Sequence, residues 1–89
     1  MKQEDKDARI IAAALQRLNE HRLPRILSLK KKVDGGEVLD EFDLEFLQRV
    51  FDSARDMNPI VDRNPDYKHI RDKAIGLCED ILEKSEANE

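Results

Sequence analysis

The sequence is poor in the residues that usually mark secreted, membrane-spanning or cofactor-binding proteins. It has one cysteine, Cys78, no tryptophan, three phenylalanines and one tyrosine. A single cysteine cannot form an internal disulfide, and no stretch approaches the ~18 consecutive apolar residues of a membrane span. Residues 1–9 are mostly charged and no apolar run follows them, which is unlike a secretory signal peptide. We therefore expect a soluble protein in a reducing, cytoplasmic setting, with no membrane partner.

Charged residues are abundant instead, and their balance is acidic. They make up 40% of the chain, against 39% apolar residues, and the net charge is −4. This balance disfavours a general binder of nucleic acids or of anionic membranes. The chain of 89 residues has room for one domain, 1–89, and we expect frayed tails at 1–4 and 85–89. The initial Met1 and the polar tail favour a complete short protein.

Proline, glycine and asparagine divide the chain into four segments, each with the composition of a helix. The first helix is expected over about residues 5–22, where apolar residues recur at the spacing of an amphipathic helix. The second begins at Pro24, whose fixed φ suits the first helical position, and ends before Gly35. A single helix that is kinked at Pro24 is the alternative.

The third helix is expected over about residues 40–57. Asp40 can cap it, and Asp43 three residues later imitates a capping box. The apolar side chains of this helix cover an arc of about 200°, which is wider than one neighbouring helix requires. We therefore expect the third helix to be central in the fold.

The fourth helix is expected to begin with Asn64 as its cap and Pro65 at its first position. Its apolar residues form a stripe of about 160°. The short segment before it contains Ile60 and Val61, and we expect this segment to close one end of the core.

These segments predict an all-α fold. The expected architecture is a small helical bundle of three long helices and one short helix, with antiparallel neighbours because the connections are short. The helical wheels place Leu47, Phe51, Ile70 and Leu77 in the core.

The run 34–45 resembles a calcium loop in outline, since it combines acids, glycines and flanking helices. An EF-hand loop requires Gly at its sixth position and a bidentate Glu at its twelfth. With Asp34 as the first position the sixth is Leu39, and with Gly36 as the sixth the twelfth is Phe42. Neither register supplies a ligand set, so we predict no metal ion and no cofactor there.

The other candidates for chemistry also have simpler structural interpretations. His69 has Asp66 and Asp72 at the three-residue spacing of a helical metal site, but it lies on a polar face and lacks ligands on other helices. His21 suits the negative end of a helix. Cys78 lies within an apolar stripe and is expected to be a buried structural thiol. No catalytic constellation is visible, so we predict that the protein is not an enzyme.

A basic stretch is the main exception to the acidic balance. Its members, the candidate contacts for phosphate or an acidic partner, are Arg22, Arg25, Lys30, Lys31 and Lys32. The simpler interpretation is that the lysines complement the negative end of the second helix. Residues 34–52, which follow, carry seven acids against only Arg49, and this acidic flank weakens a nucleic-acid interpretation.

One edge of the apolar arc on the third helix is a candidate docking surface. It contains Leu39, Phe42 and Phe46, which must be covered by the short second helix, by the Ile60–Val61 segment or by another chain. We expect part of this edge, centred on Phe42 or Phe46, to stay exposed and to bind a partner. Full coverage by the second helix is the alternative.

The leading functional hypothesis is a non-enzymatic helical protein-interaction module, such as an adaptor, regulator or small subunit. Its partner is another protein or a second copy of the chain. The alternative hypothesis is a small nucleic-acid-associated regulator that uses residues 22–32. The stretch Leu23–Leu47 resembles short bacterial proteins, and this resemblance implies no function.

Overall fold

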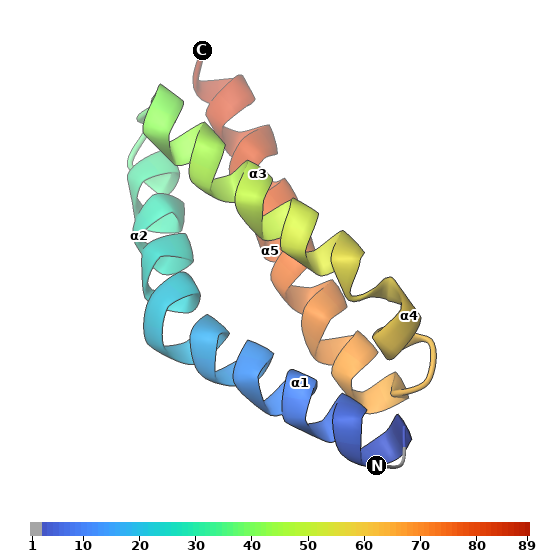
Figure 1. Ribbon diagram of the computed structural model, residues 1–89. Coiled ribbons are helices and arrows are strands. Elements are labelled where there is room, and N and C mark those ends of the chain that lie inside the picture. Colours follow the sequence, from blue (N-terminus) through green and yellow to red (C-terminus); the bar gives the residue numbers. More distant parts are fainter. Residues whose placement is uncertain (1–2) are drawn as a thin grey trace.

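Helices account for nearly all of the backbone that the structure describes. The computed structural model describes residues 3–89, with side chains from residue 5, and this part of the chain contains no strand (Figure 1). The elements in chain order are α1 (Gln3–Arg17), the π-helical segment η1 (Leu18–Arg22), α2 (Leu23–Asp34), α3 (Glu41–Asp56), α4 (Asn58–Val61) and α5 (Pro65–Asn88). The predicted all-α class is therefore confirmed.

The first two expected helices form one continuous, bent helix, so the kinked alternative is the one observed (Figure 1). The backbone widens into η1 immediately before Pro24, and the N–H of Leu23 donates to the carbonyl of Leu18, five residues back. Proline has no N–H and its ring clashes with the carbonyl four residues earlier. A π turn at this point accommodates the ring without ending the helix.

Local signals define the helix ends after this bend. Gly35 follows the last residue of α2, and Gly36 adopts a φ of +93°, a conformation that side chains with a Cβ rarely tolerate. The predicted capping box at α3 is confirmed: the N–H of Asp43 donates to Oδ1 of Asp40 at 2.8 Å, and the N–H of Asp40 donates to Oδ2 of Asp43 at 3.2 Å. These local interactions determine the residues at which α2 ends and α3 begins.

The start of α5 differs from the expectation at one residue. Pro65 occupies the first turn as predicted, but the side chain of Asn64 does not cap the helix. Its amide donates instead to the carbonyl of Ile60 at 2.7 Å and to a carboxylate of α1 at 3.2 Å. Val61, in α4, is buried, in agreement with the expected closing role of this segment.

The central helix is α5, which packs against α2, α3 and α4. The expectation that residues 40–57 form the central helix is therefore wrong. α3 runs antiparallel to α2 and to α5, and α2 and α5 run in the same direction (Figure 1). Their C-terminal ends are joined by Asn88, whose amide donates to the carbonyls of Val33 and Glu37, each at 2.8 Å.

The C-terminal residues are ordered by these contacts. Ser85 is buried and its hydroxyl accepts the N–H of Leu39 at 2.9 Å. A frayed tail was expected at 85–89; in the structure α5 extends to Asn88, and polar side chains near its end bind the backbone of the α2–α3 connection. At the other end, Met1 and Lys2 lie outside the described residues, and α1 already includes Gln3 and Glu4.

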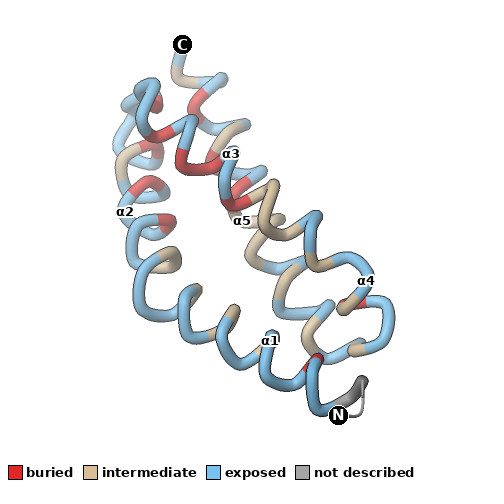
Figure 2. Tube along the Cα trace, in the orientation of Figure 1, coloured by how far each residue is buried: buried red, intermediate tan, exposed pale blue. Residues whose placement is uncertain are grey.

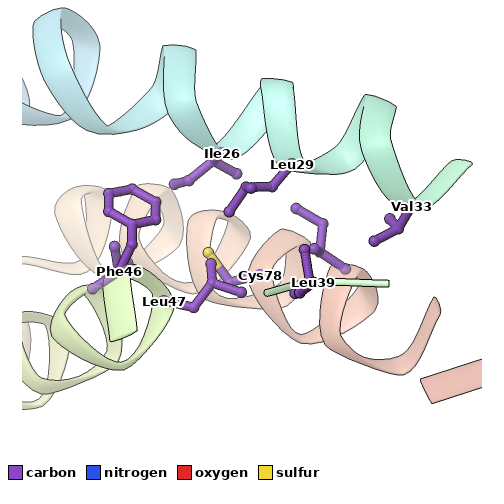
Figure 3. Close-up of a cluster of buried hydrophobic side chains, with 9 residues drawn as sticks. Ile26, Leu29, Val33, Leu39, Phe46, Leu47 and Cys78 are labelled. Atoms are coloured by element: carbon purple, nitrogen blue, oxygen red, sulfur yellow. The ribbon is translucent and has the colours of Figure 1, made fainter. Parts of the chain in front are cut away.

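The hydrophobic core lies between α2, α3 and the C-terminal half of α5 (Figure 3). Its buried members are Ile26, Leu29, Val33, Leu39, Phe46, Leu47, Val50, Cys78 and Ile81. Leu47 is confirmed as core at 1% exposure, and Phe51 and Leu77 are partly buried against the cluster. Ile70 was expected in the core but is 41% exposed, because α1 does not close over the N-terminal half of α5.

The half of the molecule that contains α1 is less tightly packed. In Figure 2 the buried residues concentrate on α2, α3 and part of α5, whereas α1 is largely exposed. The molecule measures 50 × 21 × 19 Å and exposes 6217 Å². A globular monomer of 10.3 kDa is expected to expose about 5,400 Å². None of the described helices combines the length and apolar character needed to cross a membrane.

Candidate functional site

An apolar cleft lies where the bent helix passes the C-terminal part of α3 and the N-terminal half of α5. Its volume is about 240 Å³. We call it the interhelical cleft, and its lining residues are Ala14, Leu15, Arg17, Leu18, Arg22, Val50, Ser53, Ala54, Asp56, Met57, Tyr67, Ile70, Arg71, Ala74 and Ile75. Most of these side chains are apolar, and they come from α1, η1, α3 and α5.

Small residues explain why this space is not filled. Ala14, Ala54 and Ala74 lie on α1, α3 and α5 respectively, and all three line the interhelical cleft. An alanine leaves open the volume that a leucine at the same position would occupy. Ile70, which is exposed, lies among these alanines. It belongs to the apolar stripe of α5, but its side chain lines the cleft and does not contribute to the core.

Arginine side chains dominate the polar rim of the interhelical cleft. Nη2 of Arg22 donates to Oγ of Ser53 at 3.0 Å, which joins η1 to α3. Partial burial lowers the pKa of Arg22 most, the positive charges of Arg17 and Arg49 lower it further, and Tyr67 opposes the shift. Burial also shifts the pKa of Tyr67, which it raises, and the positive charges of Arg71 and Arg22 partly oppose this rise. Positive charge is therefore concentrated at this rim.

Arg71 has a structural role at the same rim. Its Nη1 donates to the carbonyl of Ala54 at 3.0 Å and to Oδ1 of Asn58, and its Nη2 lies 3.1 Å from Oδ1 of Asp72. The bond to Ala54 satisfies a backbone carbonyl at the C-terminal end of α3, and it holds this end of α3 against α5. Arg71 therefore fixes one wall of the cleft and is already paired with a carboxylate.

An ion pair that the sequence did not reveal connects α1 to the turn between α4 and α5. Asp7, only 3% exposed, accepts from Nε of Arg63 at 2.9 Å and from Nη2 at 3.0 Å. The amide of Asn64 donates to the same carboxylate at 3.2 Å. The charge of Asp7 raises the pKa of Arg63, mainly through this hydrogen bond. These contacts hold the N-terminal part of α1 near the turn between α4 and α5.

The expected docking edge is mostly covered. Leu39 and Phe46 are each 8% exposed and belong to the core, so the expectation of an exposed edge is corrected at both positions. The cause is α2, which covers them: the guanidinium of Arg25 lies 4.5 Å from the ring centroid of Phe46. Phe42 differs, since it is 73% exposed, and it is therefore the part of this edge that stays exposed as expected.

The structure does not bring the basic stretch together as one site. Lys30 pairs with Asp34 at 2.6 Å, as expected for a lysine near the end of α2. Lys32 contacts Asp43 at 2.8 Å, and Arg25 lies 3.7 Å from the same carboxylate. Arg22 reaches the interhelical cleft instead, and Lys31 is exposed.

Asp43 is the acid around which two of these cations gather. Desolvation raises the pKa of its buried carboxyl. The hydrogen bond from Lys32, the N–H of Asp40 and the charges of Lys32 and Arg25 have the larger combined effect, so the pKa of Asp43 is lowered. The pKa of Lys32 is correspondingly raised, first by this hydrogen bond. Two of the five members of the basic stretch, Arg25 and Lys32, therefore pair with acids at the start of α3.

Residues with catalytic or metal-binding potential are placed apart. Cys78 is buried as predicted, and burial raises the pKa of its thiol to about 11. His69 is exposed, in agreement with its predicted polar face, and Nε2 of exposed His21 lies 3.9 Å from a carboxylate oxygen of Glu20. Within the described part of the chain, no group of three His, Cys, Asp or Glu side chains is arranged to hold a metal ion.

Comparison of the chain with protein-family models, with curated proteins and with solved structures finds no match.

Proposed function

We propose that this chain is a non-enzymatic helical protein-interaction module whose interhelical cleft receives apolar side chains of a partner protein. The observation that carries the proposal is the cleft itself, an apolar space of about 240 Å³ between four helical elements. Small-molecule and cofactor sites are usually larger, about 300–1,000 Å³. A cleft below that range suits a few anchoring side chains of a protein segment.

The exposed area of the molecule supports the same proposal. The chain exposes 6217 Å², about 800 Å² more than a globular monomer of its mass is expected to expose. A standard protein–protein interface buries about 800 Å² on each partner. The excess is thus of the size that one partner covers, and the loosely packed half of the molecule contains the cleft.

The nucleic-acid alternative has less support. Lys30, Lys32 and Arg25 each lie within ion-pair distance of a carboxylate, which reduces the positive charge that they offer to phosphates.

A cytoplasmic location belongs to the proposal as well. Cys78 is the only cysteine and its thiol is buried, so the chain forms no internal disulfide that would require an oxidising compartment.

The test is to fill the cleft without disturbing the rest of the molecule. In Ala74→Phe the ring occupies the cleft, and Ala87→Phe adds the same ring at an exposed position near the end of α5. Immobilised wild type and both variants are compared for proteins retained from an extract of the source organism, after circular dichroism confirms equal helicity. Proteins retained by wild type and Ala87→Phe but lost with Ala74→Phe support the proposal. Identical sets for all three proteins contradict it.

A further inference from the structure

Two arginines of the bent helix line the interhelical cleft, and a third arginine acts on one of them through its charge. Arg17 and Arg22 line the cleft, and Arg49 lies one helical turn before Ser53, the residue that accepts the hydrogen bond of Arg22. Among the described residues, no ion pair joins any of the three to an acid. The contrast is with the arginines that do pair, which are Arg25, Arg55, Arg63 and Arg71.

The positive charge at this rim contrasts with the net charge of −4 of the whole chain. The positive charges of Arg17 and Arg49 both lower the pKa of Arg22, so each of them lies close enough to repel the guanidinium of Arg22. One acid, Asp56, also lines the cleft, but it forms no ion pair with them. Like charges held together beside an apolar surface cost free energy in the free protein. A partner carboxylate would offset that cost.

We infer that the occupant of the interhelical cleft is an acidic amphipathic helix, whose apolar face enters the cleft and whose carboxylates pair with Arg17, Arg22 and Arg49. The inference rests on the proposed function and adds the chemistry of the partner. An apolar groove between helices is the usual receptor for an amphipathic helix. Guanidinium groups bind carboxylates through paired hydrogen bonds, and complementary charge gives specificity and speeds association. A free phosphate would use the arginines but would leave the apolar floor of the cleft uncovered.

The test uses two synthetic peptides with the same leucines at helical i, i+4 and i+7 spacing. One carries Glu at the flanking positions and the other carries Lys, and both are about 15 residues long because shorter isolated helices are marginal in water. Binding of each fluorescein-labelled peptide is measured by anisotropy at low salt and at about 0.15 M ionic strength. We expect the Glu peptide to bind at least about tenfold more tightly than the Lys peptide, with an affinity that falls as salt rises.

Variants assign the preference to the arginines. The double variant Arg17→Gln with Arg49→Gln is expected to weaken the Glu peptide about tenfold and to flatten its salt dependence. The matched control, Lys31→Gln with Lys84→Gln, removes the same charge near the C-terminal ends of α2 and α5 and is expected to change neither. Equal loss in both double variants would overturn the inference, since the effect would then follow net charge alone.

The remaining outcomes separate the inference from the proposed function. Equal binding of the two peptides that Ala74→Phe abolishes would overturn the acidic preference and leave the cleft as a docking site. The absence of binding by either peptide to the wild type would contradict both. Light scattering tests whether the wild type self-associates. If Ala74→Phe abolishes this self-association and the Glu peptide does not compete with it, the occupant of the cleft is a second copy of the chain and the inference is wrong.

Discussion

Arg63 meets Asp7 through two parallel hydrogen bonds, of 2.9 and 3.0 Å, although the residues are 56 positions apart in the chain. The contact ties the start of the bent helix to the turn between α4 and α5. The amide of Asn64 donates to the same carboxylate at 3.2 Å, so two residues of that turn contact Asp7. The position of α1 should therefore depend on this ion pair more than the core does.

The first prediction concerns this ion pair. Asp7→Asn removes the charge that holds Arg63, so α1 is expected to open locally while α2, α3 and α5 stay folded. Hydrogen exchange with mass spectrometry should show exchange in α1 that is about tenfold faster or more, with little change elsewhere. Asp5→Asn, at an exposed neighbouring position, is the control. Unchanged protection of α1 in Asp7→Asn would show that apolar contacts alone hold it.

The second prediction concerns acid sensitivity at Asp43. Because the pKa of Asp43 is lowered in the folded protein, the unfolded chain binds this proton first as the pH falls. The contribution of Asp43 is complete above the ordinary pKa of an aspartate, about 3.9, and is lost as the pH falls through the lower folded value. Urea unfolding at a series of pH values should therefore show a smaller acid loss in Asp43→Asn than in wild type.

The control for this prediction is Asp80→Asn, which removes an exposed carboxyl on α5. Its pH profile is expected to run parallel to that of the wild type. A profile of Asp43→Asn that also runs parallel to the wild type would mean that Lys32 and Arg25 do not stabilise the carboxylate.

The third prediction contrasts two residues that the helical wheels treat alike. Leu47 is 1% exposed and Ile70 is 41% exposed. Leu47→Ala is expected to lower the free energy of unfolding by roughly 2–5 kcal/mol, because it leaves a cavity in the core. Ile70→Ala is expected to cost less than about 1 kcal/mol, since its side chain borders open space. Urea denaturation of both variants measures the difference, and equal losses would contradict the exposure of Ile70.

Local features of this fold could be predicted from sequence, and features that depend on distant residues could not. The Asp40–Asp43 capping box and the first-turn Pro65 were predicted correctly because their physics involves only a few adjacent residues. The bend at Pro24 remained one of two alternatives. Whether a helix ends or widens into a π turn there depends on what it packs against, and the sequence pattern does not contain that information.

Helical wheels also give the width of an apolar face but not the identity of its partner. Residues 40–57 have the wider arc, yet the long helix α5 lies between α2, α3 and α4 and packs against all three. The Asp7–Arg63 pair has no periodic signal that could reveal it. The alanines of the interhelical cleft, Ala14, Ala54 and Ala74, were a usable signal, since small residues on several helix faces indicate unfilled space.

The fourth prediction uses Cys78 as a reporter of the core. Its thiol is buried and its pKa is raised to about 11, so the reactive thiolate is scarce in the folded protein at pH 8. A thiol reagent such as dithiobis-nitrobenzoate is expected to react only through unfolding, with a rate that rises in parallel with the unfolded fraction in urea. Rapid reaction in the absence of urea would show that α2 and α5 separate without global unfolding.

The last prediction separates two phenylalanines on one edge of α3. Phe46 is 8% exposed and Phe42 is 73% exposed, although they are only one helical turn apart. Phe46→Ser places a hydroxyl among apolar side chains and removes a ring, so it is expected to cost roughly 3–5 kcal/mol or more and to unfold much of the protein. Phe42→Ser is expected to change stability by no more than about 0.5 kcal/mol. Any loss of self-association in Phe42→Ser, measured by light scattering at high concentration, therefore reports a contact surface and not a folding defect. A wild type that stays monomeric would reject the homodimer, and a large loss of stability in Phe42→Ser would show that its ring packs within the chain.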